Sequence, residues 1–192
     1  MASERRLLLG VLLILALVLP FGAWLVDRAR HAEPAGGASR ATGAETDVTV
    51  QTYAAGTRAP PLGLTTLDGG TLDLARYRGR PVLLNFWASW CAPCVREFPL
   101  LRRTLDQHRA GGLVVLGVLI NDAPGKARRF VREHGGTWPV GIDQGGRAVD
   151  AFRLVGVPET VFVRRDGTLS SRVLGELTQA RLDAQLAPVL GP

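Results

Sequence analysis

Cysteine is scarce in this 192-residue sequence: there are only two, Cys91 and Cys94, three positions apart. A structural zinc site needs four ligands, but the sequence has no second CxxC and only three scattered histidines. A c-type haem attachment site requires histidine directly after the second cysteine, where Val95 stands. A structural disulfide gains stability by closing a long loop, and this pair would close almost none. The pair therefore indicates a redox-active dithiol, with no metal or other cofactor expected.

Lysine is also nearly absent. Lys126 is the only one, so arginine supplies almost all the positive charge behind the formal net charge of +6. The arginines are dispersed along the chain and form no basic stripe, which argues against a nucleic acid partner. A solvated surface with some attraction to anionic lipid is expected instead.

One long apolar run is present, Leu7–Val26. About 20 residues of helix span about 30 Å, the thickness of the hydrocarbon core of a bilayer. The run predicts that residues 1–30 form a membrane anchor; a cleaved signal peptide is the alternative, because Pro20 and Gly22 could end a short signal helix. Such segments usually export the part of the chain that comes after them. We therefore expect a single-pass protein of the cytoplasmic membrane, with its catalytic domain in the periplasm or another extracytoplasmic space.

The rest of the chain divides into a linker and one domain. Residues 31–57 are rich in Ala, Gly, Ser and Thr without an apolar period, which predicts a flexible linker. Residues 58–192 alternate strand-like and helix-like patterns, which predicts an α/β layer structure. The expected elements are a hairpin over Leu62–Leu74, strands Val82–Trp87 and Leu113–Ile120, helices Val95–His108, Ala127–His134 and Arg147–Leu154, a hairpin of Thr160–Arg164 and Leu169–Leu174, and helix Thr178–Leu190.

Two motifs lie within this order of elements: Asn85–Cys94 (NFWASWCAPC) at a strand–helix junction and Gly156–Thr160 (GVPET) before the second hairpin. With the element order, they resemble the thioredoxin superfamily. Cys94–Pro99 (CVREFP), GVPET and the N-terminal apolar run are similar to the membrane-anchored TlpA-like reductants, which include the ResA and CcmG groups. The resemblance covers residues 58–192. It implies a thioredoxin-like three-layer α/β fold with a mixed central sheet, preceded by an N-terminal transmembrane helix.

The two cysteines have different predicted roles. Cys91 comes first, at a helix start where the dipole lowers thiol pKa, and would be the attacking thiol; Cys94, one turn inward, would resolve the mixed disulfide. The resemblance implies that Glu97 acts on the cysteines, and a nearby carboxylate raises thiol pKa. The alternative for Glu97 is a first-turn acid stabilised by the helix dipole. Asn85 stands where cytoplasmic thioredoxins carry an aspartate, so Glu97 is the better candidate for proton transfer to Cys94.

Four residues are predicted to contact the partner protein. Trp90 offers an apolar surface beside the cysteines. Pro158 is implied by the resemblance to follow a cis peptide bond and to lie against the cysteines; its alternative is an edge-strand proline. The Val157 backbone would then pair with an extended partner segment. Glu159 could repel or select partners, or could be an ordinary surface acid.

The residues between the cysteines indicate the direction of electron flow. Ala92 and Pro93 carry no cation that would stabilise a thiolate and make a strong oxidant, so a protein-disulfide reductant is expected. Its expected partners are protein disulfides, with apocytochrome c suggested by the resemblance, and a membrane electron donor that reduces the Cys91–Cys94 bridge again. One alternative is a disulfide-introducing oxidant. Another is a copper-binding chaperone similar to the Sco type, although the longer cysteine spacing and histidine ligand of that type are missing.

Overall fold

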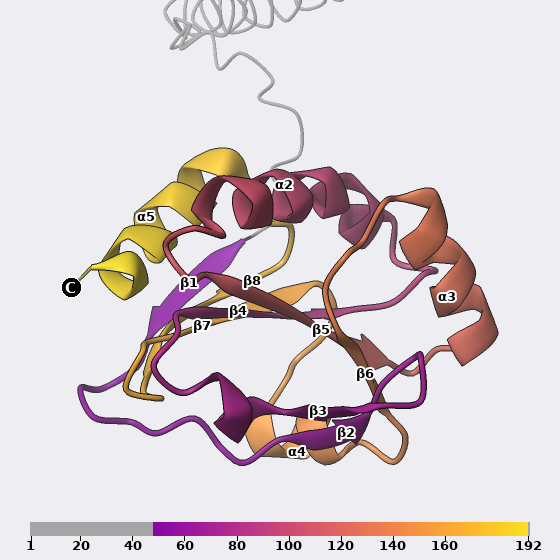
Figure 1. Cartoon of the computed structure of the whole chain (residues 1–192), viewed down its shortest axis with the longest axis horizontal. Helices are drawn as coiled ribbons and strands as arrows, with labels where there is room; N and C mark the ends of the chain where they lie inside the picture. Colours follow the sequence, from indigo (N-terminus) through magenta and orange to yellow (C-terminus); the bar gives the residue numbers. More distant parts are fainter. Residues whose placement is uncertain (1–47, 192) are drawn as a thin grey trace, which may run out of the picture. The chain divides into compact units, whose positions relative to one another are not determined.

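A six-stranded mixed sheet forms the centre of the domain (Figure 1). The computed structural model describes residues 48–191. Its strands lie in the order β1 (Thr49–Thr52), β8 (Leu169–Leu174), β7 (Glu159–Val163), β4 (Val82–Trp87), β5 (Val114–Ile120) and β6 (Val140–Asp143). Strands β4, β5 and β6 run parallel, whereas β7, β8 and β1 add antiparallel pairs. The predicted mixed central sheet is confirmed.

Both faces of the sheet are covered, which gives three layers. Helices α2 (Ala92–His108), α3 (Pro124–Glu133) and α5 (Gln179–Leu190) contribute to the apolar cluster on one face. The other face packs on α4 (Arg147–Phe152), the hairpin of β2 (Gly63–Thr65) and β3 (Thr71–Asp73), and the short 3-10 helix η1 (Leu74–Tyr77). Figure 1 shows the first group of helices above the sheet and α4 below it. The predicted helices and hairpins are thus present, with ends shifted by a few residues.

Strand β4 and helix α2 position the cysteine pair. All six residues of β4 are buried, as expected of a central strand covered on both faces. Helix α2 begins at Ala92, earlier than the predicted Val95, because Cys91 caps the helix and Pro93 lies in the first turn, where proline is well tolerated. The sequence pattern could not show this start, since the first turn lacks the apolar spacing of the later turns.

Strand β1 corrects the predicted linker. Thr49–Thr52 fall within residues 31–57, where a flexible linker was expected, but they pair with β8 in antiparallel register from Thr49 opposite Leu174 to Thr52 opposite Ser171. All four residues of β1 are exposed. The strand therefore has no alternating apolar pattern, and its position depends on backbone pairing with a strand far along the sequence.

The expected membrane anchor, residues 1–30, and most of the expected linker lie outside the described residues. Between residues 48 and 191, no helix is long and apolar enough to cross a bilayer.

Candidate active site

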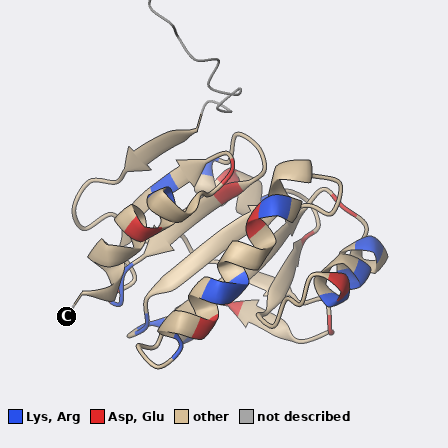
Figure 2. Cartoon of the chain, turned by 90° about the horizontal axis from the view of Figure 1, so that it is seen from above, with Lys and Arg blue, Asp and Glu red and all other residues tan. Residues whose placement is uncertain are grey.

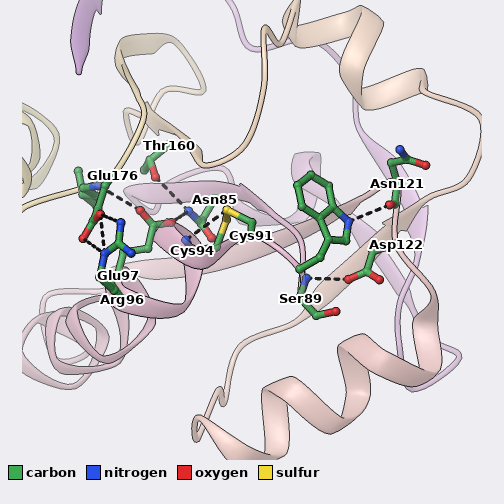
Figure 3. The surroundings of a disulfide bond; sticks show 12 residues. Asn85, Ser89, Cys91, Cys94, Arg96, Glu97, Asn121, Asp122, Thr160 and Glu176 are labelled. Carbon is green, nitrogen blue, oxygen red and sulfur yellow. Dashed lines mark hydrogen bonds and ion pairs between the residues drawn. A yellow bond between two sulfur atoms is a disulfide. The ribbon is translucent and has the colours of Figure 1, made fainter. Parts of the chain in front are cut away.

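The two cysteines form a disulfide where β4 leads into α2 (Figure 3). Their Cα atoms are 5.2 Å apart. Cys91 is the helix N-cap, and its Sγ accepts a hydrogen bond from the Cys94 N–H at 3.2 Å. The free N–H groups and the dipole of a helix N-terminus favour negative charge, so this position stabilises a Cys91 thiolate once the disulfide is reduced.

The exposed fractions of Cys91 and Cys94 differ only slightly. Cys91 is 4% exposed and Cys94 is fully buried. Cys91, the predicted attacking thiol, is thus the more accessible of the two residues, but only by a few per cent of its surface. A partner disulfide must therefore approach closely to reach Cys91, and Cys94 has no exposed surface for such an approach.

Glu97 lies in the interior behind the disulfide, with only 1% of its surface exposed. Its Oε1 accepts a hydrogen bond from Asn85 Nδ2 at 2.7 Å, and its Oε2 accepts one from the Leu177 N–H at 3.0 Å. Asn85 Nδ2 also donates to Thr160 Oγ1 at 3.1 Å. Because Glu97 follows Cys94 by three residues on α2, both lie on one face of the helix. The structure thus places an acid, an amide and a hydroxyl in one buried network (Figure 3).

Burial raises the pKa of Glu97 from its ordinary 4.5 to about 7. The hydrogen bonds from Leu177 and Asn85 act in the opposite direction, and the neighbouring Glu176 carboxylate adds to the rise. A carboxyl group with a pKa near 7 can both accept and donate a proton around neutral pH. The alternative of a first-turn acid stabilised by the helix dipole is wrong, because α2 begins at Ala92 and its first turn contains no acid.

An ion pair that sequence reasoning missed joins α2 to the segment after β8. Arg96 donates to Glu176 through Nε at 3.1 and 2.9 Å and through Nη2 at 2.5 Å. The two residues are 80 positions apart, and no local motif marks Glu176. The next residue, Leu177, supplies the N–H that binds Glu97. The pair therefore joins α2 to the segment that supplies a hydrogen bond to Glu97.

Trp90, the residue before Cys91, is a large apolar residue with 61% of its surface exposed. Its Nε1 donates to the Asn121 carbonyl at 3.1 Å, and the neighbouring Ser89 N–H donates to Asp122 Oδ2 at 2.6 Å. These bonds fix the loop before Cys91 to the loop after β5 (Figure 3). Trp90 is therefore held in place with an exposed apolar surface. Its role as a partner contact stays a prediction, and no sequence motif marks Asn121 or Asp122.

The loop before β7 contains the predicted cis proline. The Val157–Pro158 peptide bond is cis, as the resemblance implied. Pro158 is buried, and its carbonyl accepts a hydrogen bond from the Gly175 N–H at 2.9 Å. Half-buried Val157 packs on the apolar cluster that contains both cysteines. Its own N–H and carbonyl have no backbone partner within residues 48–191, so both remain available to an extended segment.

Glu159 requires a correction. Neither a partner contact nor an ordinary surface acid describes it, because it is fully buried. It lies on β7, which has strands on both sides and cover on both faces, and it pairs with Arg172 at 3.1 Å. Burial raises the pKa of Glu159, while the nearby Arg172 guanidinium acts to lower it. Glu159 therefore contacts groups inside the domain and cannot touch a partner protein directly.

A metal-binding function would need further ligands near the cysteines. In residues 48–191, no group of three or more His, Cys, Asp or Glu side chains is arranged to hold a metal ion.

Solved structures with this fold include several thiol–disulfide exchange proteins. A DsbE-type thiol:disulfide interchange protein from Chlorobium tepidum matches with a TM-score of 0.66 and 26% identity, covering 73% of this chain and 98% of its own. A secreted Mycobacterium tuberculosis disulfide oxidoreductase, homologous to E. coli DsbE, matches with a TM-score of 0.60 and 25% identity, covering 66% and 95%. The fold and the cysteine pair define a thioredoxin-like thiol–disulfide oxidoreductase.

Sequence comparison supplies the family. The AhpC/TSA family profile matches residues 55–172, and the chain belongs to this family. A curated relative, the thiol-disulfide oxidoreductase ResA of Oceanobacillus iheyensis, is 30% identical over 138 residues, which are 70% of this chain and 72% of that protein. The predicted resemblance and the predicted thiol–disulfide exchange activity are confirmed.

Proposed function

We propose that this protein reduces disulfides of partner proteins outside the cytoplasm, held at the membrane by residues 1–30. The observation that carries the direction of transfer is the surroundings of the dithiol. No cation lies between the cysteines, and Glu97 is buried on the same helix face as Cys94. The helix N-terminus stabilises the Cys91 thiolate, but no cation between the cysteines adds to this effect, and the nearby Glu97 carboxylate disfavours the thiolate state that a strong oxidant needs. These surroundings therefore favour a reductant.

In the first step, Cys91 forms a mixed disulfide with the partner protein. An extended segment of the partner pairs with the Val157 backbone and contacts Trp90, which brings its disulfide to the helix N-terminus. The Cys91 thiolate attacks one partner sulfur, the partner S–S bond breaks, and the other partner sulfur leaves as a thiolate that takes up a proton. The product is a mixed disulfide through Cys91.

The second step regenerates the internal disulfide. Glu97 accepts the proton of the Cys94 thiol, and the Cys94 thiolate attacks Cys91 Sγ. The mixed disulfide breaks, and the second partner sulfur leaves and takes up a proton. Two electrons have then passed from the dithiol to the partner, which leaves the Cys91–Cys94 bridge. A membrane electron donor must reduce this bridge before the next cycle.

The proposed location and partners have separate support. Leu7–Val26 is long enough to anchor the chain. The matching Mycobacterium tuberculosis oxidoreductase is a secreted protein. The resemblance to TlpA-like reductants suggests apocytochrome c, or a protein that handles it, as the reduced partner.

The reduction potential tests the direction of transfer. At equilibrium with redox buffers of known composition, the Cys91–Cys94 couple is expected to lie below about −200 mV, because strong oxidants lie near about −120 mV. The fraction reduced can be read from the mass added by a thiol reagent after acid quenching. A potential close to the oxidising end would replace the reductant with the disulfide-introducing oxidant.

Location is tested on the full chain. A reporter active only outside the cytoplasm, fused after Pro192, is expected to be active, and the fusion is expected to stay with membranes in alkaline carbonate. The matched control is the same fusion with Leu7–Val26 deleted, which should be inactive and soluble. A reporter active only in the cytoplasm would contradict the proposed location, and a carbonate-soluble chain starting after residue 30 would show a cleaved signal peptide.

A further inference from the structure

Glu159 and Arg172 form an ion pair inside the domain that the exchange steps do not use. The side chains are 1% and 13% exposed, and Arg172 Nη1 lies 3.1 Å from Glu159 Oε1. Phe86, the register partner of Glu159, belongs to the apolar cluster on the α4 side of the sheet, away from the Glu97 network. Removing two charges from water is costly, so a buried ion pair is a weak source of stability by itself. The further contacts of Glu159 and Arg172 show which part of the domain the ion pair holds in place.

Arg172 binds the end of helix α4. Its Nη1 donates to the carbonyls of Phe152 and Arg153 at 3.3 and 3.2 Å, and its Nε donates to Gln51 Oε1 on β1 at 2.8 Å. Arg153 has a φ of +51°, a conformation that a residue with a side chain rarely adopts. The guanidinium therefore holds the chain where it leaves α4 in an unusual turn.

Glu159 binds the middle of the same loop. Its Oε2 accepts a hydrogen bond from the Val155 N–H at 3.5 Å, while Oε1 accepts from Arg172. The end of the loop is fixed by the bond from Gly175 to the Pro158 carbonyl. Residues 153–157 are thus held at the start by Arg172 of β8 and in the middle by Glu159 of β7, and the next residue, Pro158, is held by Gly175, which follows β8. Along this loop, the Val155 residue is 73% exposed, and the Val157 backbone has no backbone partner among the described residues.

We infer that Arg172 and Glu159 are positioning residues that hold the loop 153–157 in the shape that docks an extended segment of the partner protein. The inference rests on the proposed docking at Val157. Arginine suits this role because its Nη1 lies within hydrogen-bond distance of the Glu159 carboxylate and two loop carbonyls while its Nε binds Gln51 on β1, and the single ammonium of lysine cannot occupy both positions. Neither residue touches the reacting sulfurs, so the pair governs partner binding and leaves the exchange chemistry intact.

The test compares Arg172→Met and Arg172→Lys with the unchanged protein. For a disulfide-bonded protein substrate, KM is expected to rise about tenfold in Arg172→Met and less in Arg172→Lys, with kcat nearly unchanged, because the lost interaction acts in binding. The rate with a small aromatic disulfide and the reduction potential should not change. Amide hydrogen exchange across residues 153–157 should become faster in both variants. Arg172→Lys keeps a cation opposite Glu159, so the test does not depend on Arg172→Met folding.

Arg109→Met is the matched control, because Arg109 pairs with Asp106 at 3.3 Å on the exposed surface of the domain. This variant should change neither the KM for the protein substrate nor the rate of amide hydrogen exchange in residues 153–157. Unchanged exchange of the loop in both Arg172 variants would overturn the inference. Faster exchange with an unchanged KM would also overturn it, by showing that partners do not dock on this loop. The proposed reductase would remain in either case, since it depends on the potential of the cysteine pair.

Discussion

Replacing Cys94 with serine is expected to abolish turnover and to leave Cys91 joined to partner proteins in stable mixed disulfides. The chain has only two cysteines, so no other thiol can resolve the intermediate once Cys94 is removed. A serine hydroxyl does not attack disulfides at neutral pH. Loss of multiple-turnover activity should therefore be complete, while the first transfer to Cys91 is retained. Non-reducing electrophoresis of the full chain from membranes, followed by mass spectrometry of the adducts, measures the result.

Cys91→Ser is the control for this trap. The remaining Cys94 is fully buried and should form no adducts with protein partners. Equal adduct yields from the two variants would contradict the assignment of attacking and resolving roles. Multiple turnover by Cys94→Ser would remove the need for a resolving thiol altogether.

The second large expected effect is a pH-dependent stability that originates at Glu97. Its pKa is about 7 in the folded protein and 4.5 ordinarily, so the folded state binds the proton more tightly. The stabilisation from this proton is fully present below about pH 4.5 and is lost as pH rises through about 7, with a total of about 3 kcal/mol. Urea unfolding of the oxidised protein between pH 4.5 and 8 should show this decline. Glu97→Gln, which cannot ionise, should flatten it.

The difference between the two pH profiles isolates Glu97 from other titrating groups. Burial also raises the pKa of Glu159, and that contribution remains in both proteins and cancels. Glu133→Gln, which replaces an exposed acid on α3, is the matched control and should keep the unchanged slope. A Glu97→Gln profile parallel to that of the unchanged protein would contradict the raised pKa.

Much of the fold could be predicted from local patterns. The continuous apolar run of β4, the glycine turns of both hairpins and the threonine that caps α5 are short-range signals, and the structure contains each element. Strand β1 escaped prediction because its four residues are exposed and its partner strand lies more than 100 residues away. Pairing over such a distance leaves no trace in the local sequence.

In the candidate site, too, local motifs predict some residues but not those that meet only in the folded domain. Cys91 and Cys94 follow from spacing, and Pro158 from a short motif. The surroundings of Glu97 could not be predicted, because Asn85, Thr160 and Leu177 come from three separate segments that meet only in the folded domain. The burial of Glu159 could not be predicted because a charge in a loop-like motif usually faces water, and its partly buried partner Arg172 lies on the next strand.

Charged residues occur along the helices and in the loops (Figure 2), and among the described residues the buried acids are Glu97 on α2, Asp143 on β6 and Glu159 on β7. Thr160 lies opposite Asn85 on the face of the Glu97 network, and the adjacent Glu159 points to the opposite face, toward Arg172. One inserted or deleted residue between Pro158 and Thr160 would turn each side chain to the wrong side of the sheet and disrupt both networks at once. Insertions and deletions should therefore be tolerated in surface loops such as the one after α3. They should not be tolerated between Pro158 and Thr160, where both networks require the present spacing.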